Sequence, residues 1–393
     1  MTYLVLAYLY WIAGIALTWV MVRKLPPLAP SAPGMGTSKD FPPLQILVAA
    51  RNEELEIGKC LRSLLAQDYP DLRILLADDG STDGTRQIAE AIAAGDDRLE
   101  ILSPGEPPPG WVGKCWALHQ AFQEAERRGY VQGSILLFTD ADAIFHPRAL
   151  SVAVGRLREE GLDLVALLPK LVNETFWEKC LQPSVFHGLL GAGILSEIFP
   201  SRKFPRLASG AFLLVRPEAY LAVGGHLALR HQIIEDVTLA TRVHLKSGRT
   251  RSYWAPDLLR IRMYHGFKEL WLGWSKTFFA GTMDRLPVAM GMFLVILLFS
   301  TFPPLVLAGL VASAAATGAG WPLAGAAAIL CILMTGVRWW GNRFMKEAPI
   351  FAFLHPLAGA VTVAVLVAST WSRRFGRGTL WRGRRYAIRK PAG

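Results

Sequence analysis

Residues 135–142, ILLFTDAD, form an apolar run that ends in two carboxylates. A short apolar run of this kind is typical of a buried β-strand. Side chains alternate along extended backbone, so Asp140 and Asp142 are expected on the same side. Two such carboxylates repel each other unless a cation lies between them, and carboxylate oxygens suit Mg²⁺ or Mn²⁺. The alternative is a pair of surface acids that flank a turn.

Strand-like runs and helical patterns alternate on both sides of this segment, from about Leu44 to Leu286. This alternation predicts an α/β fold, a mostly parallel, Rossmann-like sheet with helices on its faces. The predicted strands are Leu44–Ala49, Arg73–Ala77, Leu99–Leu102, Ile135–Thr139 and Leu164–Leu168, and the predicted helices are Glu54–Gln67, Gly84–Ala94, Lys114–Arg128 and Arg148–Glu160.

Polar residues follow the first two predicted strands. The first strand runs into Ala50-Arg51-Asn52-Glu53-Glu54, and the second runs into the turn Asp78–Thr85. Open α/β sheets bind ligands at this carboxyl edge. A structural turn needs only one or two of these residues. The adjacent acids therefore indicate a carboxylate that is kept for a ligand group such as a uracil N–H or a ribose hydroxyl.

Two further segments place charges at predicted helix starts. Gly110-Trp111-Val112-Gly113-Lys114 precedes a helix, where backbone N–H groups and Lys114 could contact a phosphate; a solvated lysine is the alternative. Glu235-Asp236 begins another helix, where acids are ordinarily just favourable with the helix dipole. An enzyme with a cation site also needs a base to deprotonate its acceptor, and Asp236 is the best candidate.

Several other chemistries lack their sequence signatures. The chain has no Gly-x-Ser-x-Gly elbow for a nucleophilic serine. It has no Gly-x-Gly-x-x-Gly, and Cys115 follows Lys114 where a phosphate loop would need Ser or Thr. Its 4 cysteines form no Cys-x-x-Cys pair for zinc or redox chemistry.

The chain starts with a segment typical of a membrane anchor. Hydrophobic residues make up 52% of the 393 residues, and the excess lies at the two ends. No charge occurs from Met1 to Val22, and Arg23 and Lys24 follow at once, which predicts an uncleaved anchor over residues 1–24 with a cytosolic basic end. A cleaved signal peptide is the alternative. Residues 25–43 are rich in proline and are predicted to be a linker.

The C-terminal part is predicted to be a membrane region over residues 287–372. The charge-free stretch Val288–Val337 suits two crossings with a break near Thr317–Pro322, and Ala348–Ser372 suits a third. If the catalytic domain is cytoplasmic, at the inner face of the cell membrane, three crossings would place the tail outside, against the positive-inside rule. One of the three runs is therefore expected to be re-entrant or interfacial.

The formal charge of +11 is concentrated in the tail, residues 373–393. A basic segment directly after an apolar run is expected to face anionic lipid headgroups, so a membrane and not a nucleic acid is the predicted partner. The basic residues are Arg373, Arg374, Arg377, Arg382, Arg384, Arg385, Arg389 and Lys390.

An aromatic-rich stretch lies between Tyr264 and Arg285. It predicts a helix in the membrane interface that could roof an acceptor site, and core packing is the alternative. Pro183–Phe199 is a second apolar run that could be interfacial. The predicted acceptor-side residues are His265, Trp271, Trp274 and Lys276.

The strand-end and helix-start motifs, taken in order from Ala50 to Asp236, resemble those of the family 2 inverting glycosyltransferases with a GT-A fold. The resemblance covers residues 44–286. Within the family the chain is most similar to the membrane-bound carotenoid type, the 4,4'-diaponeurosporenoate glycosyltransferases. That similarity extends to Gly224-Gly225-His226, Arg230-His231, Arg262-Met263-Tyr264, Gly273-Trp274-Ser275-Lys276, His355-Pro356-Leu357 and residues 381–386.

The resemblance implies a hexose transfer from a UDP-sugar to a terpenoid or other lipid acceptor. It implies Mg²⁺ or Mn²⁺ on Asp140 and Asp142, Asp79 at the uridine, and Asp236 as base beside Glu235. The nucleotide-sugar site would comprise Ala50, Arg51, Glu53, Asp79, Lys114 and Asp140. The usual proline before Ala50 is Ala49 here.

Other functions stay open on the sequence alone. A processive polysaccharide synthase is one, but the chain lacks the Gln-x-x-Arg-Trp signature of such enzymes after Asp236, which favours a single transfer. A polyprenyl-phosphate sugar transferase is another. A non-catalytic membrane scaffold that keeps the fold is the third.

Overall fold

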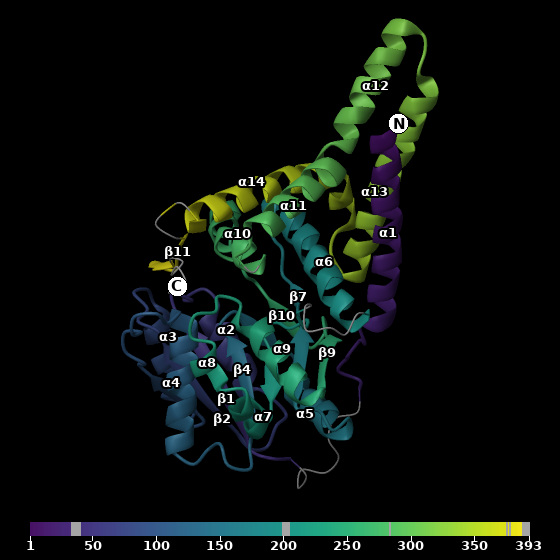
Figure 1. The fold of residues 1–393 in the computed structure, drawn as a ribbon. Helices are drawn as coiled ribbons and strands as arrows, with labels where there is room; N and C mark the ends of the chain where they lie inside the picture. Colours follow the sequence, from purple (N-terminus) through teal and green to yellow (C-terminus); the bar gives the residue numbers. More distant parts are fainter. Residues whose placement is uncertain (33–40, 199–204, 283, 375, 377–378, 387–393) are drawn as a thin grey trace. The chain divides into compact units, whose positions relative to one another are not determined.

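The computed structural model describes residues 1–32, 41–198, 205–282, 284–374, 376 and 379–386. The chain forms two compact units, each built from separated stretches of sequence. We call Leu25–Val172 with Leu195–Met263 the α/β unit, and Met1–Lys24, Asn173–Ile194 and Tyr264–Gly393 the helical unit. Figure 1 shows strands in the first and long helices in the second.

A mixed, mostly parallel sheet forms the centre of the α/β unit, as predicted. Its strand order is β3-β2-β1-β4-β8-β6-β9. Only β8 runs antiparallel, and it pairs with β4 on one side and β6 on the other. The strands are β1 (Leu44–Ala50), β2 (Leu72–Asp78), β3 (Leu99–Leu102), β4 (Ile135–Asp140), β6 (Leu164–Leu168), β8 (Leu213–Val215) and β9 (Thr250–Trp254).

Helices cover this sheet because each has one apolar face. In α4, Cys115, Leu118 and Phe122 recur at helical spacing and are buried in the core with residues of β1 and β4. The predicted helices exist, each within a few residues of its expected ends. The helices of the unit are α2 (Ile57–Leu65), α3 (Thr85–Ala93), α4 (Gly113–Arg127), α5 (Ala149–Glu159), α7 (Pro217–Ala222), α8 (Gly225–Ala228) and α9 (Glu235–Ser247).

A second, small sheet starts directly after β4. It has the order β5-β10-β7, with β5 (Ala143–Phe145), β10 (Leu259–Ile261) and β7 (Lys170–Leu171). The segment Asp140-Ala141-Asp142 therefore connects the two sheets, which restricts its backbone at both ends.

The units divide the chain differently from the contiguous domain expected over 44–286. Part of the predicted linker packs in the α/β unit, where Leu25 and Leu28 are buried and the Leu28 N–H donates to the Trp254 carbonyl at 2.8 Å. Residues 33–40 lie outside the described part. Residues 173–194 and those from Tyr264 onward belong instead to the helical unit. Within it, His187 of the 173–194 segment lies 3.1 Å from the Thr18 hydroxyl, and Phe267–Gly281 packs on His355–Arg374.

The helical unit contains α1 (Thr2–Lys24) and a C-terminal series of helices. Leu4, Ala7 and Trp11 of α1 pack against Leu330 and Met334 of α13. The other elements are α6 (Phe176–Ile198), α10 (Phe267–Gly281), α11 (Leu286–Ile296), η2 (Leu297–Thr301), α12 (Pro303–Thr317), α13 (Trp321–Phe344), η3 (Pro349–Leu354), α14 (His355–Arg374), β11 (Thr379–Trp381) and β12 (Arg384–Tyr386).

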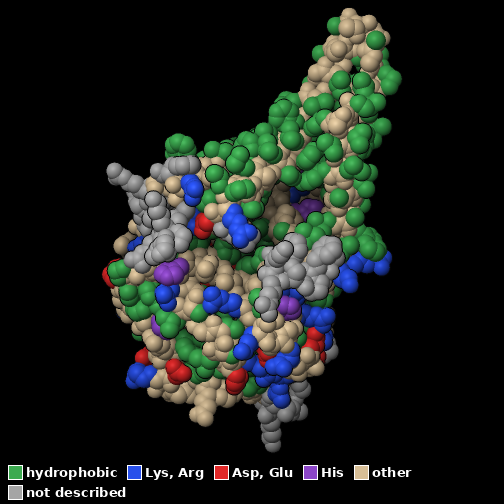
Figure 2. All heavy atoms as spheres, viewed as in Figure 1, with side chains coloured by type: hydrophobic (Ala, Val, Ile, Leu, Met, Phe, Trp, Pro, Cys, Tyr) green, Lys and Arg blue, Asp and Glu red, His purple; other side chains and the backbone are tan. Residues whose placement is uncertain are grey.

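Within the described residues, three helical segments are long and apolar enough to cross a membrane: Thr2–Lys24, Trp321–Phe344 and Pro349–Arg374. Leu286–Thr301 and Pro303–Thr317 together meet the same test but are bent by 46° at Phe302, as in a broken span or a re-entrant loop. Two prolines follow Phe302, and proline removes a backbone N–H from a helix. In Figure 2, hydrophobic side chains cover the outside of α12 and α13. The predicted break near Thr317 is the turn between these two helices.

Candidate functional site

The turns after β1 and β2 are linked by hydrogen bonds. The strands pair in parallel with Ala50 opposite Asp78, so their carboxyl ends lie side by side. The Asp79 N–H donates to the Ala50 carbonyl at 2.9 Å, and the Arg51 guanidinium donates to the Asp79 carbonyl. Asp78 and Asp79 are both buried at this edge. The structure therefore brings Ala50, Arg51 and Asp79 together, as their positions after parallel strands predict.

Asn52 holds these two turns in register. Its φ is 54°, in the left-handed region that asparagine tolerates better than most residues. This geometry lets the Asn52 Oδ1 accept the Thr82 N–H at 2.8 Å, while the Glu53 N–H donates to the Thr85 hydroxyl at 2.7 Å. Hydrogen bonds from backbone N–H groups thus hold the turn after β1 against the turn after β2.

Lys114 connects the end of β4 to the start of α9. Its Nζ lies 2.5 Å from Asp140 Oδ1 and 2.5 Å from Glu235 Oε1. The Glu235 side chain is only 6% exposed, while those of Lys114 and Asp140 are 29% and 34% exposed. Lys114 was expected at a phosphate. In the structure its ammonium pairs with Asp140 and Glu235, and the charge of Asp236 acts on it as well.

Asp236 faces the same group of charges. Its Oδ2 accepts the Gly210 N–H at 2.7 Å, and its Oδ1 accepts the Val237 N–H at 2.8 Å. Burial and the adjacent Glu235 carboxylate raise the pKa of Asp236 to about 6, although Lys114 opposes the rise. Burial acts to lower the pKa of Lys114, but Asp140, Glu235 and Asp236 outweigh it and raise the pKa. The pKa of Asp236 is thus close to neutral pH, where a carboxylate is most effective as a general base.

Asp142 lies with Asp140 and Glu53 around the buried thiol of Cys60. Burial raises the pKa of Cys60, and the charges of Asp142, Asp140 and Glu53 raise it further. The Cys60 thiol also donates to the Asp140 carbonyl at 3.6 Å. Cys60 is therefore a neutral packing group beneath the acidic segment.

The residues present fit a Mg²⁺ or Mn²⁺ ion that is completed by a substrate. Mg²⁺ is usually held by one or two carboxylates together with phosphate oxygens and water. Asp140, which pairs with Lys114, and Asp142, whose charge acts with that of Asp140 on the Cys60 thiol, supply such carboxylates. No group of three or more His, Cys, Asp or Glu side chains is placed to hold a metal in the part of the chain that the structure describes. Among the described residues, protein side chains alone would therefore not complete the coordination of the ion.

The predicted acceptor-side residues lie in the helical unit, around α10. Trp274 is buried, stacks on Phe278 with ring centroids 5.2 Å apart, and meets Tyr264 edge-on. Residues of α10 also pack on α14, where the Phe279 N–H donates to Ser369 Oγ at 3.0 Å. For Trp274 the core-packing alternative describes its environment better than an exposed interface. Trp271 and Lys276 are partly exposed on the same helix, and His265 contacts Glu269 just before it.

Gly210 was not predicted to lie at the site. It precedes β8, and a Cβ at this position would lie 2.7 Å from Lys114 Nζ and 2.8 Å from Asp140 Oδ2. The run Ala208-Ser209-Gly210-Ala211 of small residues before a buried strand was a signal of close backbone approach.

Replacing Gly210 with alanine is expected to reduce turnover by at least about tenfold, because the methyl group pushes Lys114 and Asp140 apart. The melting temperature should change little, since the lysine end can move. Steady-state donor turnover and thermal unfolding measure the two effects. Gly95→Ala is the control, because its Cβ would meet only the Ile92 carbonyl at 3.6 Å. Full turnover in Gly210→Ala would contradict the close approach.

Comparison with known proteins defines the class. Residues 45–213 match the family described as Glycosyl transferase family 2. The chain thus carries a family 2 domain with the GT-A fold, and it is a glycosyltransferase.

Individual relatives cover most of the chain. The 4,4'-diaponeurosporenoate glycosyltransferase of Staphylococcus aureus strain USA300 is 26% identical over 365 residues, which are 88% of this chain and 89% of the relative. That of strain MRSA252 is 25% identical over 351 residues, with the same coverage of both chains. The solved structure of the mannosyltransferase PcManGT from Pyrobaculum calidifontis, in complex with GDP-Man and Mn²⁺, matches with a TM-score of 0.54 at 19% identity, covering 94% of this chain and 95% of that one. At this identity the solved structure supports the fold.

Proposed function

We propose that the chain transfers a hexose from a UDP-sugar to a lipid or terpenoid hydroxyl or carboxylate by inverting single displacement. The observation that carries the proposal is the convergence of Lys114, Asp140, Glu235 and Asp236 at the carboxyl edge of the sheet. Open α/β folds bind nucleotides at this edge. The relatives named as diaponeurosporenoate glycosyltransferases and the apolar helices of this chain support a lipid-type acceptor.

Each group has a role in this proposal. Asp79, at the end of β2, binds the uridine, and Ala50, Arg51 and Glu53 complete the nucleotide site. For a hydroxyl acceptor, Asp236 accepts the acceptor's proton as the sugar leaves the nucleoside diphosphate, whereas a carboxylate acceptor is already deprotonated and needs no base. The Gly210 N–H fixes the orientation of the Asp236 carboxylate. Lys114 contacts the diphosphate when the donor is bound.

A divalent ion is part of the same proposal. Mg²⁺ or Mn²⁺ held by Asp140 and Asp142 would supply positive charge to the departing diphosphate. Mn²⁺ in the PcManGT structure supports a divalent ion in a protein of this fold.

The location proposed for the enzyme is the inner membrane, with the α/β unit in the cytosol. Helix α1 ends in Arg23 and Lys24, and basic residues remain on the cytosolic side. The bent pair of helices from Leu286 to Thr317 would allow the run that does not cross to be re-entrant.

The experiment replaces Asp142 with asparagine in purified full-length protein. Sugar transfer and UDP release with any acceptor are expected to fall below detection, because one carboxylate that holds the ion is lost. Asp97→Asn, an exposed acid after α3, is the matched control and should retain full activity. Undiminished UDP release by Asp142→Asn refutes the proposal. Mass spectrometry of lipids from cells with and without the gene identifies the sugar and the acceptor.

A further inference from the structure

Arg338 of α13 is a buried charge. The residue is 2% exposed, and none of its three guanidinium nitrogens has a hydrogen-bond partner among the residues that the structure describes. Arg373 of α14 is similarly buried, yet it donates from Nε and Nη2 to Asp284 at 3.1 and 2.7 Å. An unsatisfied buried guanidinium is costly, and an ionisable group within an apolar span is a functional candidate. The contrast with Arg373 indicates that Arg338 is arranged for a group from outside the chain.

The surroundings of Arg338 are polar but hold few acceptors. His355, at the start of α14, and Cys180 of α6 both interact electrostatically with Arg338. The Nε2 of His355 has no hydrogen-bond partner, while its Nδ1 is 3.4 Å from Ser184 Oγ. Glu347 is a carboxylate whose charge acts on Arg338, but it makes no hydrogen bond to the guanidinium. Among the described residues, Glu347 is thus the one carboxylate whose charge is found to act on Arg338, and the guanidinium N–H groups remain available to an anion.

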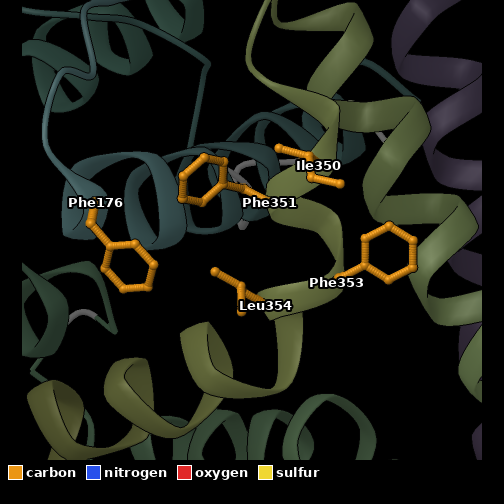
Figure 3. A pocket seen from close by; sticks show the side chains of 5 residues that line it. All are labelled: Phe176, Ile350, Phe351, Phe353 and Leu354. Carbon is orange, nitrogen blue, oxygen red and sulfur yellow. The ribbon is translucent and has the colours of Figure 1, made fainter.

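An apolar pocket adjoins this cluster. It has a volume of about 280 Å³ and is lined by Phe176 of α6 and by Ile350, Phe351, Phe353 and Leu354 of η3. Figure 3 shows Phe176, Phe351 and Leu354 around the same space. Leu354 directly precedes His355, and the Cys180 thiol lies 3.9 Å from the Leu354 carbonyl. The pocket and the buried charge thus share the same two segments, α6 and the junction of η3 with α14.

We propose that the helical unit binds an amphiphile with one anionic oxyacid headgroup, a carboxylate or a phosphate. Its headgroup oxygens pair with the Arg338 guanidinium and His355 Nε2, and the start of its hydrocarbon chain occupies the pocket. Arginine binds planar oxyanions through two parallel hydrogen bonds, which compensates for its burial. That this lipid is the acceptor rests on the proposed function, whereas binding itself does not.

The test uses the full chain in phosphatidylcholine nanodiscs without donor. The probes are retinoic acid, farnesyl phosphate and the neutral alcohol retinol, and the measurements are the dissociation constant and the ligand-induced shift in melting temperature. Arg338→Met is expected to weaken anion binding at least about tenfold, with retinol unchanged, since charge-assisted hydrogen bonds are lost. Arg343→Gln, an exposed arginine on the same helix, is the matched control and should bind as the wild type does.

The unliganded stability distinguishes a ligand site from a structural charge. Without ligand, Arg338→Met should melt at the same or a higher temperature, because an uncompensated charge is removed. The inference is overturned if anion binding survives in Arg338→Met. It is also overturned if that variant melts lower and a second change, Glu347→Gln, restores it, because the pair would then be structural.

A second variant covers the case in which Arg338→Met does not fold. Leu354→Trp fills the pocket and should weaken all three probes equally, and unchanged affinities would overturn the inference. Tighter binding of retinoic acid would indicate a carboxylate headgroup, and tighter binding of farnesyl phosphate would indicate a phosphate headgroup. Competition by phosphatidylglycerol would show that the ligand is an ordinary membrane phospholipid.

Measuring both probe binding and sugar transfer separates this inference from the proposed function, and Asp236→Asn should bind the probes as the wild type does while it loses transfer. A wild type that transfers sugar but does not bind the anionic probes overturns only the lipid site. Intact binding without any transfer by the wild type overturns only the transferase proposal.

Discussion

Asp236→Asn is expected to lower sugar transfer by about 10² to 10⁴ while it raises the melting temperature of the protein. Activity with a hydroxyl acceptor falls because the amide cannot accept the proton of that hydroxyl. Stability rises because Asp236 lies beside Glu235 and Asp140, and the substitution removes one of these repelling charges. Donor turnover with saturating acceptor and thermal unfolding in EDTA at pH 7 measure the two effects.

The pH dependence of the stability follows from the pKa of Asp236, which burial and the Glu235 carboxylate raise from its ordinary value of 3.8 to about 6. The folded protein binds the proton more tightly than the unfolded chain, so the wild type gains stability as the pH falls through 6. The advantage of Asp236→Asn, on the order of 5 °C at pH 7, should therefore shrink towards zero near pH 4. Glu218→Gln, which removes an exposed acid from the first turn of α7, is the control and should change neither activity nor stability. A pH-independent advantage would contradict the electrostatic cause.

Lys114→Met is expected to abolish transfer and to destabilise the metal-free protein. The substitution leaves Asp140 and Glu235 without the ammonium that lies 2.5 Å from each. Loss of the ammonium costs on the order of 1 to 3 kcal/mol, since the Glu235 carboxylate stays desolvated while Asp140 is partly exposed. Thermal unfolding in EDTA measures this loss.

Addition of Mn²⁺ tests whether another cation can replace the Lys114 ammonium among these carboxylates. It should raise the melting temperature of Lys114→Met more than that of the wild type, because a cation then replaces the missing ammonium among the carboxylates. Lys59→Met, which removes an exposed lysine paired with Glu56, is the matched control and should respond to Mn²⁺ as the wild type does. An equal response of Lys114→Met and wild type would contradict the shared cation position.

The elements of the fold were predictable because local pattern and burial agree. The apolar runs at β1, β2 and β4 are short, continuous and bounded by polar turns, so their hydrophobicity alone identifies them as buried strands. Helices such as α4 carry one apolar stripe and were found to within a few residues. Asp79 and Asp140 could be placed at one edge because parallel strands end on the same side.

The packing of two segments could not be predicted from local sequence pattern. Trp274 has the composition expected of an interfacial residue, yet it packs against Tyr264 and Phe278. Aromatic side chains suit both an interface and a core, so only the contacts of α10 distinguish them. Part of the proline-rich stretch after α1 is likewise packed, since Leu28 pairs with Trp254 far along the chain.

Local sequence pattern was enough to predict the α/β fold and the position of acids at the strand ends, because strand periodicity and turn chemistry act between near neighbours. Tertiary structure alone decided that Lys114 pairs with Asp140 and Glu235, that Gly210 lies against them, and that Arg338 is buried without a hydrogen bond. Those facts depend on which distant segments meet, and the burial and partners of a charged side chain are set by segments far away in the chain.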